Sequence, residues 1–474
     1  MGLLQKAYET YVANAAYVGV DRETKGTLCP EAHIIQKAAI EIALDEEGRF
    51  LGAQAVPPED SRTLIPATEK SASRTSGDEA HPLCDQLCYL SGEDENKHGK
   101  YLAGLRAWID SPDAHPDLMP VLRYIQGGTI LDDLTRAGLL TEKARSEGKK
   151  GDKAYLKYLV RWIIDGRHCW QNRELMAAYR AYAAHTSDAP IGLCMISGEE
   201  GPLCASNDKG ITAANNGAKL ISSNDSSGFT YRGRFVEAEQ ACTVSIEASQ
   251  KAHRALQWVV ASQGVVIGGR TFVCWNPQGK RVKQPASPMA KRATESVVYR
   301  SSTNYCENVK RTLSGYRNEL PAGAGVVTAV FDAATTGRLA LTYYSELEGN
   351  DFYKRLEAWY GSCCWPFGRF GIESPLLIQI ANCAYGVERD NRIETDAKVL
   401  REATQRLLAC MLNCAPVPDD IVRCLFNKAA NPLRYQSTNN RFTLLCTACA
   451  IIRKHHNDLK KKEEWTMELD ENKN

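Results

Sequence analysis

Four side chains between positions 81 and 98 are of the types that bind zinc. They are His81, Cys84, Cys88 and His98, and two thiolates with two imidazoles would complete a tetrahedral set of ligands. The spacing argues against a metal, because no second cysteine pair lies at the distance typical of a zinc finger. Cys194 and Cys204, on either side of the turn SGEEGP, are too few to hold a metal on their own. We therefore predict no metal site.

Motifs of the common catalytic classes are absent from the sequence. Gly268 and Gly269 are not followed by the lysine that holds nucleotide phosphates in a glycine-rich loop. There is neither a histidine pair with a glutamate base for zinc hydrolysis nor a Gly-x-Ser-x-Gly elbow. A cysteine paired in space with His168, His185 or His253 stays open, since such residues need not be neighbours in sequence. The sequence nonetheless predicts a protein that is not an enzyme and uses no cofactor.

Two polar segments have the composition of loops that bind phosphate. The first is EKSASRTSG, whose cations neutralise phosphate charge and whose hydroxyls hydrogen-bond phosphate oxygens; its candidates are Lys70, Ser71, Ser73, Arg74, Thr75 and Ser76. The second is NNGAKLISSND, whose amides can also read base edges; its candidates are Asn215, Asn216, Lys219, Ser222, Ser223 and Asn224. Ordinary loops share this composition, so a structural role stays open for both segments.

The composition limits the class of protein. A length of 474 residues predicts two or three domains. The 58 basic residues nearly balance the 57 acidic ones, so a nucleic-acid surface requires the cations to be segregated onto one face. No stretch approaches the roughly 20 apolar residues of a membrane span, and the N-terminus does not have the pattern of a secretory signal. We expect a cytoplasmic protein without a membrane partner, whose 17 cysteines are reduced and mostly buried.

Apolar periodicity predicts an α+β fold. A hairpin is expected in IEIALDEEGRFLG, where an acidic turn separates two apolar runs, and two more strands in VVTAVFDAATTGRLALTYYSEL. The apolar run GGRTFVCWN is also expected to be a strand. Residues 57–77, rich in Ser, Thr, Pro and Arg, are expected to form a long loop. Helical spacing is found over 100–110, 118–138, 153–184 and 237–262.

These elements suggest three regions along the chain. Residues 1–185 form an N-terminal α/β region with the Ser/Arg loop, and residues 186–348 form a central α/β region. Residues 349–474 form a mainly helical region.

Several of these segments, in order, resemble the large subunit of the type I-C CRISPR surveillance complex. The opening MGLLQKAYETYV and the hairpin IEIALDEEGRFLG are similar to the start of that family. Its loop of Arg, Ser and Gly, followed by Pro and Asp-x-x-x-Tyr-Leu-x-Gly, is matched by Arg74, Ser76, Gly77, Pro82, Asp85, Tyr89, Leu90 and Gly92. CMISGEEGPLC, GAKLISSND, TAVFDAATTGRLALTYY, NKAANP, LCTACAIIRK and WTMELDENKN then follow in the family's order. The resemblance spans nearly the whole chain.

This resemblance implies a non-catalytic subunit in antiviral defence, located at the 5′ end of the crRNA. It would recognise the protospacer-adjacent motif (PAM), aid opening of the duplex into an R-loop, and dock a helicase-nuclease, while guide pairing supplies sequence specificity. The implied partners are crRNA, target double-stranded DNA, the handle-binding and backbone subunits, and the helicase-nuclease. Arg74 is the residue that we expect closest to a base or phosphate.

One departure and two alternatives accompany this interpretation. The family normally continues into a C-terminal helical bundle, whereas this sequence stops at Asn474, so we expect a truncated chain or a bundle supplied separately. A purely structural assembly subunit that contacts only crRNA and protein is one alternative. A nuclease or cysteine-dependent hydrolase is the other.

Overall fold

Two separate sets of buried apolar side chains divide the chain into two units. The computed structural model describes residues 2–20, 26–74, 78–143, 153–213, 217–221, 235–236, 242–287, 298–333, 335 and 337–460. The N-terminal unit consists of Asn14–Asp208 and Ser222–Trp258, and the C-terminal unit of Met1–Ala13, Lys209–Ile221 and Val259–Asn474. The three regions expected from the sequence group the chain differently, and that division stays a prediction.

The N-terminal unit is built on a sheet with the strand order β3-β2-β5-β6. Its strands are β2 (Ile40–Leu44), β3 (Phe50–Ala55), β5 (Val160–Ile164) and β6 (Arg167–His168). β2 pairs antiparallel with β3 and parallel with β5. The predicted hairpin is confirmed, and Gly48 in its turn has φ +84°, a conformation that favours glycine. Ile42, Leu44 and Trp162 on the two central strands are completely buried.

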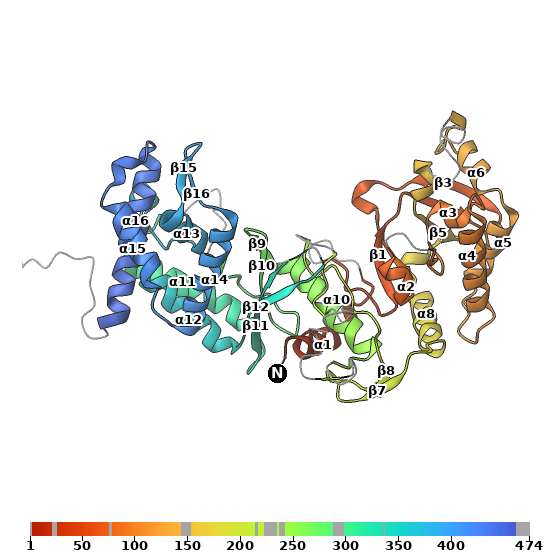
Figure 1. The fold of residues 1–474 in the computed structure, drawn as a ribbon, viewed down its shortest axis with the longest axis horizontal. Helices are drawn as coiled ribbons and strands as arrows, with labels where there is room; N and C mark the ends of the chain where they lie inside the picture. The colour runs from red at the N-terminus through yellow and green to blue at the C-terminus, as the bar shows by residue number, and fades with distance from the viewer. Residues whose placement is uncertain are drawn as a thin grey trace, which may run out of the picture. The chain divides into compact units, whose positions relative to one another are not determined.

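Helices complete the core of this unit around the sheet (Figure 1). They are α3 (Leu87–Leu90), α4 (Glu95–Ile109), α5 (Leu118–Gly127), α6 (Ile130–Arg136) and α8 (Arg173–His185). The predicted helix over 118–138 is two helices, because Gly128 adopts φ +70° and ends α5. Trp108 of α4 is completely buried, and its ring centroid lies 4.8 Å from that of Tyr179 on α8.

The unit also contains two short two-stranded sheets. β1 (His33–Lys37) pairs antiparallel with β4 (Arg62–Pro66), and β7 (Ile191–Leu193) with β8 (Glu200–Pro202). Along the chain, α2 (Glu69–Ser73) comes after β4, and α10 (Ile246–Gln263) comes after β8. The 3₁₀ turns of the described chain include η1 (Ala15–Tyr17), η2 (Pro58–Asp60), η3 (Ala154–Lys157) and η4 (Cys169–Gln171).

Two predictions of local structure in this unit were wrong. Residues 57–77 hold a strand and a helix rather than one long loop, because three apolar residues in β4 become a strand only when they pair with β1. The helix expected over 153–184 begins only at Arg173. Residues 160–164 form a strand instead, since the run VRWII is rich in the β-branched and aromatic residues that fit a buried sheet.

The C-terminal unit has an antiparallel sheet with the strand order β12-β11-β10-β9. Its strands are β9 (Val265–Ile267), β10 (Arg270–Trp275), β11 (Gly325–Asp332) and β12 (Ala340–Glu348). The three strands expected in this part of the sequence are confirmed. Every residue of β10 is buried, so both faces of the sheet are covered. One cover is α1 (Leu3–Ala13), where Thr10 Oγ1 accepts a hydrogen bond of 3.0 Å from Trp275 Nε1.

Helices dominate the rest of this unit, as the sequence predicted (Figure 1). They are α11 (Ser302–Asn318), α12 (Gly349–Ser362), α13 (Leu377–Tyr385), α14 (Ala397–Asn413), α15 (Asp419–Ala429) and α16 (Thr438–Lys460). Small hairpins join them, β13 (Trp365–Pro366) with β14 (Ile372–Glu373) and β15 (Val387–Arg389) with β16 (Arg392–Glu394), with 3₁₀ turns η7 (Gly368–Phe370) and η8 (Pro432–Arg434). The whole described fold is therefore α+β with a helical C-terminal region.

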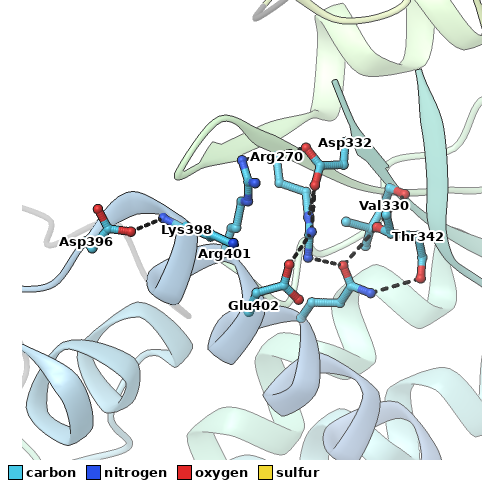
Figure 2. Close-up of polar contacts among 9 residues, drawn as sticks. Arg270, Val330, Asp332, Thr342, Asp396, Lys398, Arg401 and Glu402 are labelled. Carbon is cyan, nitrogen blue, oxygen red and sulfur yellow. Dashed lines mark hydrogen bonds and ion pairs between the residues drawn. The ribbon is translucent and has the colours of Figure 1, made fainter. Parts of the chain in front are cut away.

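A buried arginine ties α14 to the sheet of the C-terminal unit (Figure 2). Arg270, whose side chain is 4% exposed, donates to Asp332 Oδ2 at 2.6 and 3.1 Å. It also donates to Glu402 and Gln405 of α14, at 2.7 Å each. Gln405 Nε2 in turn donates to the carbonyl of Thr342 on β12 at 2.9 Å. Three strands and one helix therefore depend on a single guanidinium.

The glycines of the β9–β10 turn serve this same junction. Gly268 has φ +56°, and a Cβ there would overlap the carbonyl oxygen of Ala397 at the start of α14. Only glycine allows the turn to approach the helix so closely. This accounts for a glycine pair that is not part of a phosphate-binding loop.

We predict that Arg270→Met strongly destabilises the C-terminal unit. It removes the cation that is hydrogen-bonded to the buried Asp332 carboxylate and leaves only Arg401, which lies 3.7 Å from Oδ1. We therefore expect a loss of about 3 kcal/mol of unfolding free energy, the lower end for a broken buried ion pair. The midpoint of urea denaturation measures this loss, and hydrogen exchange of the backbone amides in β10 and α14 shows where the loss occurs. Arg423→Met, an exposed arginine of α15, is the matched control. Equal midpoints for the two variants would contradict the role given to Arg270.

Candidate nucleic-acid interface

Asp85 organises the first of the two polar segments. Its carboxylate is completely buried and accepts four hydrogen bonds. Two come from the backbone N–H groups of His81 and Gln86, each at 2.7 Å. The other two come from the guanidinium of Arg74, at 2.8 and 3.0 Å. A bidentate arginine with backbone donors satisfies a buried carboxylate fully.

Arg74 is held inside this arrangement. Its side chain is 11% exposed, and Nη1 also donates to the carbonyl of Glu79 at 2.6 Å. The guanidinium carbon lies 4.4 Å from the ring centroid of Tyr89, within the range of a cation–π contact. Arg74 therefore closes the chain between α2 and α3 into a clasped loop. A contact between its guanidinium and a nucleic acid stays a prediction.

Ser71 and His81 fasten α2 to the same loop. Ser71 takes part in a capping box with Thr68 at the start of α2. Its buried hydroxyl also lies 3.0 Å from His81 Nδ1. The pKa of His81 is lowered to about 4, chiefly by burial, while Asp85 opposes the shift and Arg74 adds to it. His81 is therefore neutral at physiological pH.

On the C-terminal side of Arg74, Asp78 is held by two residues of α4. Asp78 accepts a hydrogen bond of 2.9 Å from Asn96 of α4, and Lys100 lies 3.7 Å from the same carboxylate. Residues 75–77 lie between these two anchored ends. Thr75 and Ser76, expected to contact nucleic acid, fall in this gap and lie outside the described residues.

Of the remaining candidates in this segment, Lys70 is exposed on α2 and Ser73 ends that helix. The structure therefore distinguishes the roles of three of the six predicted residues. Ser71 and Arg74 build the loop, whereas Lys70 is turned to solvent next to it. Lys70 is the described cation of this segment that is best placed to meet a ligand.

The second polar segment is described only in part. Asn215, Asn216, Ser222, Ser223 and Asn224 lie outside the described residues. Lys219 is described, and its backbone pairs with two other segments. It forms an antiparallel bridge with Lys209 and a parallel bridge with Arg338. Its N–H donates to the carbonyl of Gly337 at 3.1 Å, and its own carbonyl accepts from Leu339 N at 2.9 Å.

These bridges place three basic residues in register, and we call them the basic triad: Lys209, Lys219 and Arg338. Side chains of directly paired residues point to the same face, about 5 Å apart at Cβ. Sequence reasoning found Lys219 but missed Lys209 and Arg338, because nothing in a linear sequence shows a pairing across about 120 residues.

The four residues first considered for zinc have other contacts. His81 contacts Ser71, and His98 Nδ1 lies 2.9 Å from the carbonyl of Tyr89. Cys84 is buried, and Cys88 Sγ lies 3.7 Å from Gln86 Oε1. Among the described residues, no group of three or more His, Cys, Asp or Glu side chains is placed to hold a metal ion.

The low pKa of His81 predicts that acid loosens the clasped loop. A histidine whose folded pKa lies below its unfolded value of about 6.5 stabilises the fold fully above pH 6.5, and this stability is lost as pH falls toward 4. We expect the loop to lose about 2 kcal/mol between pH 7 and pH 5. Hydrogen exchange of residues 69–86, corrected for intrinsic pH effects, measures this loss.

His81→Asn should remove most of this pH dependence, because asparagine does not titrate. The control is His168→Asn, which changes an exposed histidine of the same unit. If the His81→Asn variant keeps the pH dependence of the unchanged protein, the loss at low pH has another source.

Comparison with known protein families identifies the family of this chain. The family model described as "CRISPR-associated protein (Cas_Csd1)" matches residues 8–474. A search of curated proteins finds no match. Within the described residues, no helix has the length and apolar character to cross a membrane. Since the family match covers nearly the whole chain and confirms the resemblance seen in the ordered motifs, the chain belongs to the Cas_Csd1 family of CRISPR-associated proteins, the large-subunit family of type I-C complexes.

Proposed function

We propose that the chain is a non-catalytic subunit of a crRNA-guided DNA surveillance complex that recognises the PAM in duplex DNA. It would then aid opening of the duplex and dock the helicase-nuclease. Membership of the family implies that the chain works as one subunit of a multisubunit CRISPR complex. In such complexes base pairing with the guide reads the target sequence, so the protein needs to read only a short flanking motif.

The observation that carries this proposal is the basic triad. Lys209, Lys219 and Arg338 come from three separate segments and are set side by side by backbone pairing. The net charge of the whole chain is only +1, so a local row of three cations is a segregated feature. Phosphate groups of a nucleic acid backbone are the anions that such a row fits.

The clasped loop is the proposed reader of the motif. Arg74 and Asp78, described residues of this loop, are each held by a hydrogen bond to another part of the unit. A loop held on a rigid support loses less conformational entropy on binding, which favours recognition. Lys70 lies exposed beside it and supplies a charge for the DNA backbone.

A purely structural role in assembly is the main alternative. It predicts that both polar segments tolerate substitution with no change in DNA binding. The family assignment agrees with either role, so the two are separated by experiment. For a nuclease, the described residues offer no cluster of metal-binding side chains.

The first test measures binding of target duplex by the reconstituted complex, with and without this chain, across a library of flanking motifs. We expect motif-dependent binding to disappear without the chain. Lys70→Ala in the full complex should weaken binding to the preferred motif about five- to tenfold, equivalent to roughly 1 kcal/mol. Arg106→Ala, an exposed arginine of α4, is the control. Motif preference that survives without the chain would favour the structural subunit.

Substitutions of Arg74 need a separate measurement, because the residue builds the loop. Arg74→Ala should weaken DNA binding and leave assembly intact, but it should also increase hydrogen exchange in residues 69–86. Arg74→Lys keeps the charge and loses the bidentate geometry. DNA affinity unchanged in Arg74→Ala would remove the loop from the proposed interface.

The basic triad predicts a change in salt dependence. Lys219→Ala and Arg338→Ala should each weaken nucleic-acid binding by the complex across all motif sequences. Each should also reduce the slope of log affinity against log salt by about 0.9, the value for one lost phosphate contact. Lys398→Ala, an exposed lysine of α14, is the control. Slopes that match this control would exclude a phosphate contact at the basic triad.

A further inference from the structure

The hairpin of β7 and β8 (Figure 1) exposes large apolar side chains of the N-terminal unit. Ile191 is 68% exposed, and Leu193 and Met195 are each 58% exposed. Ile191 and Leu193 are two positions apart in β7, so both side chains leave the same face of the strand. Met195 begins the turn that follows the strand. We call Ile191, Leu193 and Met195 the apolar row.

The backbone that carries the apolar row is firmly held. A Cβ at Gly192 would lie 2.8 Å from Leu203 Cδ1, so the opposite face of β7 is closely packed. Thr243 holds the end of the strand from a third segment. Met195 N donates to the carbonyl of Thr243 at 2.9 Å, and Thr243 Oγ1 donates to the carbonyl of Leu193 at 2.7 Å. The exposed side chains therefore belong to a fixed surface.

Acidic side chains border the apolar row. Glu200 pairs with Leu193 across the hairpin, so the two side chains lie on the same face. Glu200 and its neighbour Glu199 are exposed, and so is Asp188 shortly before β7. The sequence has no lysine or arginine from residue 181 to residue 208. This surface is therefore both apolar and negatively charged.

This combination limits the class of partner. The outer face of a small antiparallel sheet is usually polar, whereas an exposed apolar patch with a polar rim marks a contact with another molecule. Negative charge at the rim repels the phosphates of a nucleic acid and of an anionic lipid surface. A protein surface with apolar side chains at its centre and lysine or arginine around them is complementary in both respects.

We infer that the apolar row docks another protein subunit of the CRISPR complex, one whose contact surface is apolar with a basic rim. Burial of the three apolar side chains stabilises the contact, and the acidic rim selects a basic partner. The inference rests on the proposed work within a multisubunit complex, and it does not depend on recognition of the PAM.

The first test changes the apolar row in the reconstituted complex. The remaining subunits, assembled with crRNA, are titrated with the full chain or its variants. Leu193→Asp should weaken incorporation of the chain about tenfold, because a charge would have to be buried at the contact. The matched control is Leu51→Asp, since Leu51 is a 63% exposed leucine on β3 of the same unit. Equal affinities for these two variants overturn the inference.

A milder variant covers the case in which Leu193→Asp does not fold. Leu193→Thr keeps a residue that fits a strand and removes apolar area. It should weaken incorporation about threefold, with the thermal unfolding of the free chain unchanged. A folded Leu193→Thr variant with full affinity overturns the inference. A chain that assembles through the apolar row and leaves motif preference unaffected contradicts the proposed motif recognition alone.

A charge reversal distinguishes a protein partner from a nucleic acid. Glu200→Lys places a cation beside Leu193, so it should weaken incorporation if the partner is basic. Glu59→Lys, at an exposed glutamate of η2, makes the same change in net charge and is the control. Incorporation of Glu200→Lys that equals or exceeds that of the control overturns the inference, and a stronger association would assign the row to an anion such as RNA.

Oxidation of Met195 shows which molecule covers the apolar row. Hydrogen peroxide converts an exposed methionine to its sulfoxide, which mass spectrometry detects. Met195 should be oxidised in the free chain and protected in the complex, relative to Met119 of α5, which is 37% exposed. Protection in the dilute free chain would mean that the chain covers its own row. Protection that grows with the concentration of free chain would mean a second copy. Either result, or no protection in the complex, overturns the inference.

Discussion

Each unit of this protein contains a buried aspartate whose negative charge is neutralised by an arginine. Asp85 in the N-terminal unit and Asp332 in the C-terminal unit are both buried and both paired with arginine. An unpaired carboxylate in such a place would cost several kcal/mol, so the arginine has to be brought to it. In both places the arginine comes from a distant part of its unit or from across a loop. The ion pair therefore fixes tertiary structure as well as charge.

The two pairs differ in what they hold. Arg270 joins the ends of β10 and β11 to α14, and Figure 2 shows its contacts gathered at one junction of sheet and helix. Arg74 instead closes the chain between α2 and α3 onto Asp85. The first pair consolidates a core, and the second holds a loop.

The proposed function rests on a row of basic side chains. The described residues bring no metal-binding cluster together, whereas backbone pairing sets Lys209, Lys219 and Arg338 in a row. Family membership implies that the chain works within a multisubunit CRISPR complex.

The sequence by itself determined the elements whose signals are local. The hairpin of β2 and β3, the strands β10 to β12 and the helical C-terminal region follow from apolar spacing and turn residues. The ordered motifs were enough to indicate the family. They also indicated Arg74 and Lys219 as residues to examine, without showing what surrounds them.

Tertiary structure alone decided the rest. β4 was misassigned because its short apolar run becomes a strand only through pairing with β1. The β-branched run of β5 was read as part of a longer helix, and its pairing with β2 decides for the strand. The partner of Arg74 and the neighbours of Lys219 were likewise invisible, since one is a buried carboxylate and the others lie across paired backbones. A sequence records which side chains are present, but burial and non-local pairing decide which of them meet, and these depend on the whole folded chain.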